Sequence, residues 1–305
     1  MDSPKASRAI ALGFFDGVHI GHGVLLRRTA EAAARNGARP CALTFDSHPE
    51  ALILDHAIPL LCTVEDRADL IRRLYGMQEV IFAHFDDALM HMSWRDFLQE
   101  LLIGRFHATH VVAGYDFHFG YRGEGNAALL ADACAQAGIG CDIIPRVELS
   151  GITVSSTYIR KLVAQGDIER ARLFLGHPHS LSGFVGHGRK LASSWNMPTI
   201  NFPLPAGIQS PAKGVYASTA SWGDNRLYPA VTNIGTRPTV SCGAEIVVET
   251  HILGFTGDLY GHRIRLELHK FLRPEARFHT LEALTRQIEL DIREARAFHQ
   301  IADEV

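Results

Sequence analysis

The stretch G-F-F-D-G-V-H-I-G-H, from Gly13 to His22, decides how the first half of the chain folds. It overlaps the end of the short apolar run of residues 9–15, which predicts a strand. It leads into residues 21–36, whose pattern predicts a helix that ends at Gly37. A helix that begins directly after a strand presents free backbone N–H groups and the positive end of its dipole to a phosphate. The glycines of the stretch let the backbone turn tightly and approach such a ligand closely.

The two histidines of this stretch, His19 and His22, stand three residues apart around the first helical turn, so both rings can face one phosphate. Two donors aimed at one phosphorus suit a transition state in which charge builds on the equatorial oxygens. Two other interpretations stay open at this point. In the first, the two residues are incidental surface histidines among the 17 histidines of the chain. In the second, they bind zinc, although no matching pair of Cys or His stands at ligand spacing.

Strand and helix signals alternate through the first half of the chain. Helices begin at the capping boxes Thr63-x-x-Asp66 and Ser93-x-x-Asp96, and an alanine-rich helix precedes the last strand. This alternation predicts a parallel sheet with helices on both faces, whose ligands bind beyond the carboxyl ends of the strands. The further strands are predicted at residues 39–45, 79–85, 107–114 and 142–147.

The pattern changes after about residue 176. Two helical segments, 156–165 and 168–175, end at Gly176, and closely spaced strands then follow with only one further long helix, at 281–299. This order predicts a small antiparallel β-barrel with a terminal helix. We therefore expect two domains, residues 1–176 and 177–305. The strands of the second are predicted at residues 214–222, 226–234, 245–253 and 263–271.

Bulk properties narrow the class of protein. The 305 residues are 47% hydrophobic and 21% charged, as in an ordinary soluble globular protein. The net charge of −3 offers no basic surface for nucleic acid, and no apolar run is long enough to span a membrane. The five cysteines form no C-x-x-C pair, which is typical of buried thiols in a reducing cytoplasm. We expect a cytoplasmic protein and leave a weak homo-oligomer open.

Three other stretches of the first half stand where ligands are expected. Residues 44–49, T-F-D-S-H-P, end the second strand and contain His48. Residues 114–120, G-Y-D-F-H-F-G, follow the fourth strand and contain Asp116; their two phenylalanines are equally consistent with a core-facing pair. Ser156 and Thr157 open a helix, where hydroxyls cap free N–H groups, and Arg160 falls one turn later, within reach of phosphate oxygens.

The second half contains a glycine-rich basic stretch, residues 183–191, of a kind that can hold phosphates through backbone N–H groups. Thr199 and Asn201 follow it. A hydroxyl and an amide oxygen two residues apart on a strand point to one face, where both can ligate Mg²⁺ together with ATP phosphates. Glu249 offers a carboxylate on a later strand, and taken alone it reads as an ordinary outward-facing glutamate.

In their order along the chain, these stretches resemble the bacterial bifunctional riboflavin kinase/FMN adenylyltransferase family. The resemblance implies that the first half is a Rossmann-like nucleotidyltransferase domain of the H-x-G-H superfamily. In that family the residues matching His19 and His22 stabilise the α-phosphate of ATP while the FMN phosphate attacks it and pyrophosphate leaves. The resemblance further implies that the ATP and phosphate site of this half includes Gly13, Phe15, Asp16, Gly17, Gly21, Asp116, Ser156, Thr157 and Arg160.

The second half is similar to riboflavin kinase, whose pattern includes a P-T-x-N element, an N-I-G-x-x-P-T loop and a V-E-x-x-I/V-L strand. The resemblance implies that Thr199 and Asn201 bind Mg²⁺–ATP and that Gly183, Gly188 and Arg189 surround the phosphates. It also implies that Glu249 is the general base. It assigns flavin contacts to His48, Asn233, Arg277 and Phe278. The implied ligands are riboflavin, FMN, FAD and ATP.

The chain departs from the family pattern at two places. Ser47 stands where a proline is usual, and six residues, 192–197, stand between Leu191 and Pro198 where the family has two. Two alternatives to a bifunctional enzyme are a monofunctional FMN adenylyltransferase, with a kinase impaired by that insertion, and a flavin-sensing protein without catalysis. The monofunctional alternative is disfavoured because the chain keeps Thr199, Asn201 and Glu249. The non-catalytic alternative is disfavoured because the chain keeps both histidines together with Ser156, Thr157 and Arg160.

Overall fold

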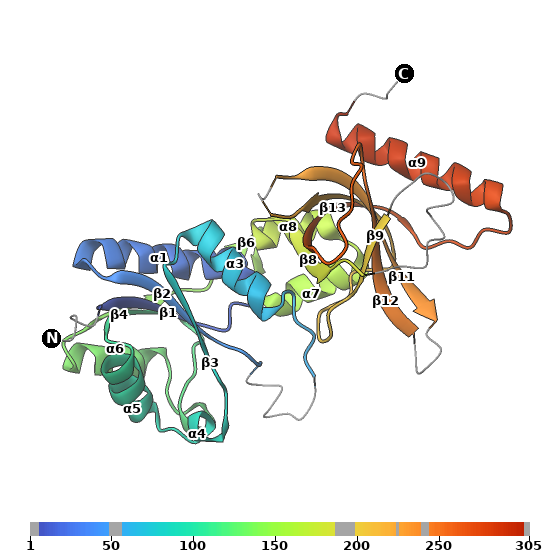
Figure 1. Ribbon diagram of the computed structural model, residues 1–305. Helices are drawn as coiled ribbons and strands as arrows, with labels where there is room; N and C mark the ends of the chain where they lie inside the picture. Colours follow the sequence, from blue (N-terminus) through green and yellow to red (C-terminus); the bar gives the residue numbers. More distant parts are fainter. Residues whose placement is uncertain (1–5, 49–56, 187–198, 224–225, 239–243, 302–305) are drawn as a thin grey trace. The chain divides into compact units, whose positions relative to one another are not determined.

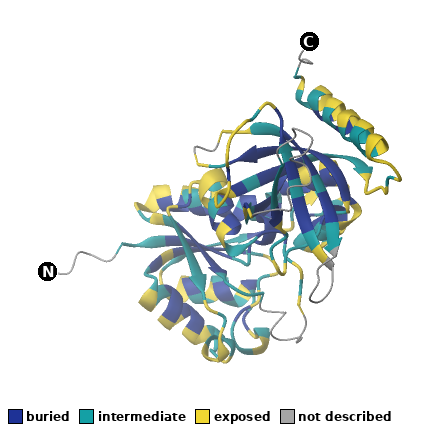
Figure 2. Ribbon diagram, turned by 45° about the vertical axis from the view of Figure 1, so that its right-hand side comes forward, coloured by how far each residue is buried: buried dark blue, intermediate teal, exposed yellow. Residues whose placement is uncertain are grey.

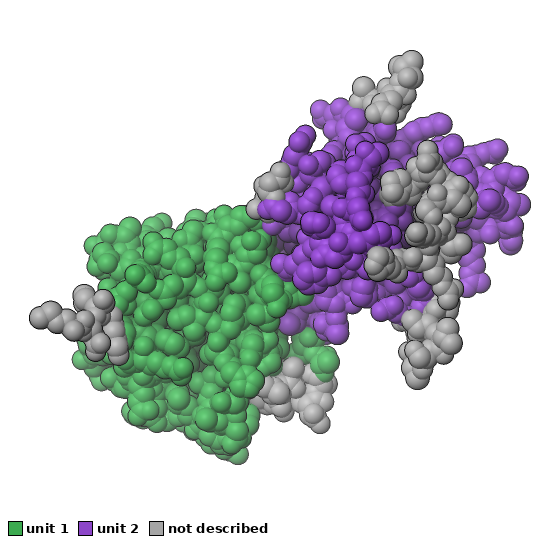
Figure 3. Space-filling model, in the orientation of Figure 1, with its two compact units in different colours: residues 1–58, 63–156 green, residues 59–62, 157–305 purple. Residues whose placement is uncertain are grey.

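The computed structural model of the chain describes residues 6–48, 57–186, 199–223, 226–238 and 244–301. The chain forms two compact units (Figure 3): residues 1–58 with 63–156, and residues 59–62 with 157–305. The helices α7 (Ser156–Gln165, from its second residue) and α8 (Ile168–Leu175) therefore pack with the second unit. The sequence places these helices in the first domain, whose expected boundary lies at residue 176.

The first unit contains the expected parallel sheet (Figure 1). Its five strands lie in the order β3-β2-β1-β4-β5, with parallel pairing throughout. This order puts the carboxyl ends of β1 and β4 side by side in the middle of the ligand edge. The strands are β1 (Arg8–Leu12), β2 (Arg39–Phe45), β3 (Glu79–Ala83), β4 (Ala108–Gly114) and β5 (Gly140–Ile144).

Local signals place the helices of this unit correctly. The Thr63 side chain accepts a hydrogen bond from the Asp66 N–H at the start of α3 (Val64–Tyr75), as its capping box predicts. The helix α1 (Ile20–Asn36) ends at Gly37, whose φ of 61° is the left-handed conformation that glycine adopts readily. The alanine-rich helix is α6 (Ala127–Gln136), and α4 (Asp87–Met90) and α5 (Trp94–Asp96) are two short helices between β3 and β4.

One helix differs from expectation in type. The Ser93 cap is present, but the chain continues from α5 into a π-helix, η2 (Phe97–Arg105), instead of an α-helix. Its wider turn buries Leu98 in addition to Phe97, Leu101 and Leu102, so four side chains enter the core from this one segment. The local helix propensity of the segment does not distinguish a π-helix from an α-helix. We attribute the choice to packing of the segment against β4 and α6.

The sheet of the first unit separates two apolar cores. One contains side chains of β1, β2 and β4 with η2 and α6, including Ile10, Leu43, Leu102 and Leu130. The other contains Phe15, Val18, Leu26 and Ile71 with the opposite faces of the same strands. Because Phe15 and Val18 are fully buried, the loop after β1 is anchored in the second core on both sides of its turn.

The second unit is a curled antiparallel sheet of six strands, in the order β8-β13-β10-β11-β12-β9. A backbone hydrogen bond of 3.0 Å from the Gly186 N–H to the Asn201 carbonyl joins the ends of the order, so the sheet curls toward closure as a barrel does. The strands are β8 (His179–Phe184), β9 (Thr199–Pro203), β10 (Gly214–Ser221), β11 (Tyr228–Pro238), β12 (Ala244–Ile252) and β13 (Arg263–Pro274). A small hairpin of β6 (Glu148–Leu149) and β7 (Ile152–Thr153) belongs to the first unit.

The terminal helix α9 (Leu281–His299) lies where the sequence predicts it. The Arg273 guanidinium on β13 forms hydrogen bonds of 2.8 and 2.7 Å to the two carboxylate oxygens of Asp291, which ties the helix to the sheet. Ala295 packs on Val215 and Ala217, and most other side chains of the helix face solvent (Figure 2). No helix among the described residues is both long and apolar enough to cross a membrane.

Candidate functional site

The loop after β1 makes an unusually tight turn before α1. Gly17 has a φ of 71°, and Phe15 and Val18 also adopt positive φ values, of 57° and 45°. A positive φ in a β-branched residue such as Val18 is a strained conformation, which burial of the side chain maintains. Strain of this kind collects at functional sites, and here it stands directly before His19.

His19 begins helix α1 and orients His22. The Nδ1 atom of His19 accepts a hydrogen bond from the backbone N–H of His22 at 3.2 Å. Neutral His19 therefore carries its proton on Nε2. The two rings stack, with centroids 3.5 Å apart and planes 11° apart. The expected pairing of these histidines on one helical turn is present in the structure.

His22 is held in its neutral form. Burial lowers its pKa well below the ordinary value, and the nearby charges of His19 and Arg67 lower the pKa further. Its Nδ1 is screened from solvent and has no hydrogen-bond partner among the residues that the structure describes. A buried ring nitrogen without a partner is costly, which suits a group that contacts a ligand.

The glycines of the loop serve packing as well as turning. A Cβ at Gly21 would lie 3.2 Å from the His19 ring, and a Cβ at Gly13 would lie 3.0 Å from the Phe15 ring. A larger residue at either position would displace the ring beside it. Both expected glycine positions are therefore explained by the close approach of an aromatic or imidazole ring.

Ser156 lies at this loop although it is 140 residues away in sequence. Its hydroxyl donates to the backbone carbonyl of Asp16 at 3.0 Å, and the Asp16 side chain is buried. Thr157 and Arg160 follow on α7, where the Arg160 guanidinium donates to the Thr157 hydroxyl at 3.0 Å. These two residues belong to the second compact unit. Their role beside the histidines stays a prediction from the sequence.

Asp116 stands exposed in the turn after β4, at the ligand edge of the sheet. The neighbouring Phe119 is buried and packs on Phe97, with ring centroids 5.3 Å apart, and Phe117 stacks on Phe119. The aromatic pair of this stretch is therefore a core pair, and it holds the turn that presents the Asp116 carboxylate.

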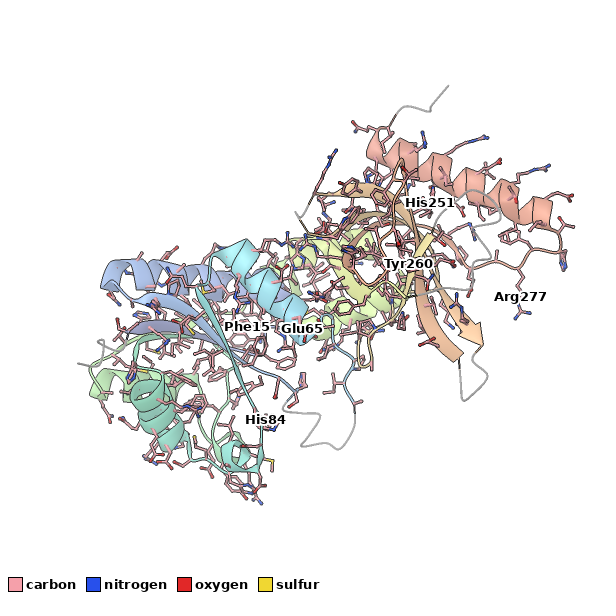
Figure 4. The ribbon with its side chains drawn as sticks, in the orientation of Figure 1. Phe15, Glu65, His84, His251, Tyr260 and Arg277 are labelled. Atoms are coloured by element: carbon pink, nitrogen blue, oxygen red, sulfur yellow. The ribbon has the colours of Figure 1, made fainter. Side chains whose placement is uncertain are left out.

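His48 lies against the loop after β1. Its ring meets the Phe14 ring edge-on, with centroids 4.5 Å apart, and the Thr44 hydroxyl donates to the Phe14 carbonyl at 2.8 Å. Two residues of this neighbourhood are absent from the sequence predictions. One is His84, whose pKa is raised by its 2.6 Å hydrogen bond to the Asp46 carboxylate; Figure 4 shows it just beyond β3. The other is the buried Arg67 on α3, which no sequence signal distinguishes from its exposed neighbours.

The polar residues predicted in the second half meet on three neighbouring strands. Asn233, Glu249 and Asn201 stand directly opposite one another on β11, β12 and β9, so they share one face of the sheet. Thr199, two residues before Asn201, shares that face, and its hydroxyl donates to Glu249 Oε1 at 3.3 Å. Because a hydroxyl has two further acceptor positions, Thr199 can hold Glu249 and ligate a cation at once.

A cavity of about 170 Å³ adjoins this polar group. Its wall is largely apolar and aromatic, and the sequence predictions did not include it. Thr199 belongs to the wall, so the cavity opens next to the hydroxyl that faces Glu249. The lining includes Val185, Ile200, Ile252, Phe255, Leu259 and Tyr260.

The remaining predicted residues have different positions. Gly183 packs on Phe202, since a Cβ there would lie 2.2 Å from that ring, so its glycine is explained by closure of the sheet. Arg277 is exposed on the connection between β13 and α9, and Figure 4 shows it at a distance from Tyr260 and His251. Phe278 lies near the Arg273 guanidinium. Gly188, Arg189 and residues 192–197 lie outside the described residues.

Oxygen donors fit a hard cation at the second site. Thr199, Asn201 and Glu249 offer a hydroxyl, an amide oxygen and a carboxylate, which is the donor chemistry of Mg²⁺. In the part of the chain that the structure describes, no group of three or more His, Cys, Asp or Glu side chains is placed to hold a metal ion. The zinc interpretation of His19 and His22 therefore finds no third ligand there.

Comparison with known proteins finds a family match for each half of the chain. A family described as FAD synthetase matches residues 2–158, and one described as riboflavin kinase matches residues 175–299. Proteins named bifunctional riboflavin kinase/FMN adenylyltransferase are similar over nearly the whole chain. That of Pseudomonas fluorescens is 35% identical, covering 94% of this chain and 91% of its own length. That of Escherichia coli K12 is 33% identical, covering 97% and 94%. That of Bacillus subtilis is 32% identical, covering 95% and 92%.

A solved structure is similar in fold to this chain. A Streptococcus pneumoniae protein, titled as a macrolide-efflux protein, superposes with a TM-score of 0.83 at 26% identity. The match covers 97% of this chain and 95% of that one. The similarity supports the fold of both units.

Proposed function

Since this chain belongs to the bifunctional riboflavin kinase/FMN adenylyltransferase family, we propose that the loop after β1 carries its adenylyl transfer and the Thr199–Glu249 group its phosphoryl transfer. The N-terminal part is an FAD synthetase domain, which joins FMN to the AMP part of ATP. The C-terminal part is a riboflavin kinase domain, which uses ATP to convert riboflavin into FMN. The observation that carries the assignment is the stacked pair of His19 and His22 at a helix N-terminus.

In the first site, a phosphate oxygen of FMN attacks the α-phosphorus of ATP, and the bond to pyrophosphate breaks. His19 donates from Nε2 to an equatorial oxygen, and His22 and the first N–H groups of α1 support the same charge. Asp116 contacts the nucleotide from the neighbouring strand end. Ser156, Thr157 and Arg160 hold the β- and γ-phosphates. No covalent enzyme intermediate is needed.

In the second site, Glu249 accepts the proton of the ribityl 5′-hydroxyl as that oxygen attacks the γ-phosphate of ATP. The Thr199 hydroxyl orients the Glu249 carboxylate through their 3.3 Å hydrogen bond. Thr199 and Asn201 would hold Mg²⁺, which would neutralise charge on the phosphates. The adjoining cavity, with Phe255 and Tyr260 in its wall, takes the adenine of this ATP.

Other assignments extend the proposal. Asn233, directly opposite Glu249, contacts the flavin of the kinase reaction, with Arg277 and Phe278 bordering the ring system. His48 contacts the flavin of the adenylyl reaction. Gly183, Gly188 and Arg189 line the phosphates of the kinase ATP, and the functional boundary between the domains lies at residue 176. The protein acts in the cytoplasm, without nucleic acid or membrane, as a monomer or a weak homo-oligomer.

One assay tests the assignment of both sites. The purified full-length chain is incubated with riboflavin, ATP and Mg²⁺, and the products are separated by chromatography. FMN and FAD are both expected, and His19→Ala should stop FAD formation while FMN continues to form. FAD arising only from supplied FMN would instead mean a monofunctional adenylyltransferase. FAD formation by His19→Ala at the normal rate would refute the role of the loop after β1.

A further inference from the structure

Arg67 on α3 is a fully buried cation in the first unit. Within the described part of the chain, its hydrogen-bond partners are neutral oxygens, and its Nε and Nη2 atoms have no partner. A buried guanidinium without a carboxylate costs a protein stability unless another interaction offsets it. An arginine kept in such a place therefore calls for a functional explanation.

The guanidinium joins the carboxyl ends of two strands. Its Nη1 atom donates to the Phe14 carbonyl at 3.0 Å, to the Phe45 carbonyl at 2.8 Å and to the Thr44 hydroxyl at 3.1 Å. Phe14 stands in the loop that leads to His19, and Phe45 is the last residue of β2, directly before the loop that leads to His48. One side chain thus fixes the separation of the two loops at the ligand edge.

The same guanidinium holds an aromatic ring between the two loops. Its carbon lies 4.1 Å from the centroid of the Phe14 ring, a cation–π distance, and that ring also meets His48 edge-on at 4.5 Å. Loss of the guanidinium would free Phe14 and with it the position of His48.

The charge of Arg67 also reaches His22. Burial, the His19 ring from the same helix and Arg67 from α3 together lower the pKa of His22. In a screened environment an unbalanced positive charge makes the neighbouring surface favourable for an anion. The phosphates of ATP and FMN are the anions that the adenylyl reaction brings to this edge.

We propose that Arg67 is a positioning residue for adenylyl transfer, which fixes the loop of His19 and His22 against the loop of His48 and supplies positive charge beneath the phosphates. The proposal rests on the assignment of adenylyl transfer to the histidine pair. It adds a residue that contacts neither substrate and that acts through Phe14, Thr44 and Phe45.

The test compares Arg67→Gln, which removes the charge and keeps an N–H donor, with Arg67→Lys, which keeps the charge. In the full-length enzyme, kcat and KM for FAD formation from FMN and ATP are measured across the pH range around neutrality. The Gln variant should lose roughly 10- to 100-fold in kcat/KM, because a small displacement of reacting groups has effects of this size. The acid limb of its pH profile should move to higher pH, since His22 then protonates more readily. The Lys variant should keep the wild-type acid limb.

Two controls accompany these variants. FMN formation by the second unit of the same molecules should be unchanged, which shows that the chain is folded. Arg72→Gln removes an exposed charge from the same helix and should leave both reactions as in wild type.

The proposal would be overturned if the Gln variant had the wild-type kcat/KM for FAD formation and an unmoved acid limb of the pH profile. It would also be overturned if the Gln and Lys variants lost the same factor in kcat/KM and neither acid limb moved. If Arg67→Gln does not fold, Thr44→Val takes its place, because it removes one oxygen of the same network in an isosteric side chain. An unchanged rate of FAD formation by Thr44→Val would then count against Arg67. His19→Ala is assayed in parallel, and its activity alone decides whether the histidine assignment itself stands.

Discussion

The imidazole rings of His19 and His22 stack face to face, with centroids 3.5 Å apart, because the Nδ1 of His19 caps the backbone N–H of His22. The cap directs the Nε2 proton of His19 away from the helix, and burial keeps His22 neutral. Two protonated rings at this distance would repel each other strongly. The pair therefore offers hydrogen-bond donors to a phosphate without requiring two buried positive charges.

Gly17→Ala tests whether the tight turn before His19 matters for adenylyl transfer. Gly17 has a φ of 71°, where an alanine costs about 1–2 kcal/mol. We expect lower thermal stability of the first unit and a marked fall in FAD formation, with FMN formation unchanged. Gly37→Ala is the matched control, because Gly37 has a φ of 61° at the far end of α1 with no neighbouring atom within 4 Å. Equal losses of FAD formation in both variants would show that stability alone explains the effect.

Glu249→Gln should remove the general base of the kinase reaction. General-base catalysis contributes roughly 10²- to 10⁴-fold, so FMN formation should fall by a factor in this range. FAD formation from supplied FMN should persist. Thr199→Val should also slow FMN formation, whereas Thr199→Ser keeps the hydroxyl that donates to Glu249 and should retain much of the rate. A Val variant as active as the Ser variant would exclude the hydroxyl from the reaction.

Tyr260→Ala should weaken ATP binding in the kinase reaction alone. Tyr260 lines the cavity beside Thr199 and is 42% exposed, so its removal should disturb folding little. Loss of a stacking partner for adenine should raise the KM for ATP at least about fivefold in FMN formation, and not in FAD formation. The control is Phe298→Ala, which truncates an aromatic side chain of similar exposure, 38%, on α9. An unchanged KM would place adenine elsewhere.

Gly183→Ala should destabilise the second unit, because the new methyl group would meet Phe202 within 2.2 Å. Overpacking of this kind costs about 1–3 kcal/mol, seen as a lower melting temperature. Gly186→Ala, a few residues along the chain, has no atom within 4 Å of the added Cβ and should be neutral. Combining Gly183→Ala with Phe202→Leu should recover part of the loss. A neutral Gly183→Ala would mean that β8 does not pack on this ring.

The second unit should lose stability in acid through His179. Burial lowers the pKa of this histidine from 6.5 to about 4, and it is only 2% exposed. The pKa of His179 is lower in the folded chain than in the unfolded chain. The unit therefore keeps its full stability at pH values above 6.5, the pKa in the unfolded chain, and loses stability as the pH falls toward 4. The loss should be on the order of 3 kcal/mol. Denaturant unfolding at several pH values should show a shallower decline for His179→Leu than for wild type, and the exposed control His279→Leu should decline like wild type.

Much of the first site could be predicted from the sequence because its signals are local. The cap at Thr63, the helix that ends at Gly37 and the histidines one turn apart each depend on residues within four positions of one another. Alternation of strands and helices then predicted the parallel sheet, whose geometry brings the ends of β1 and β4 together. The type of the η2 helix and the place of α7 and α8 depend instead on packing with distant segments.

By itself the sequence determined the alternation of strands and helices in the first half, the closely spaced strands of the second half and the residue types at both candidate sites. The tertiary structure decided which of those residues meet: strand register set Asn233, Glu249 and Asn201 opposite one another. It also decided the role of residues without any sequence signal, since Arg67 differs from the exposed Arg72 only in what surrounds it. Helix caps and hydrophobic periodicity depend on residues within a single helical turn, so they can be recognised from neighbouring residues in the sequence. Register, burial and unbalanced charge arise between segments that are distant along the chain.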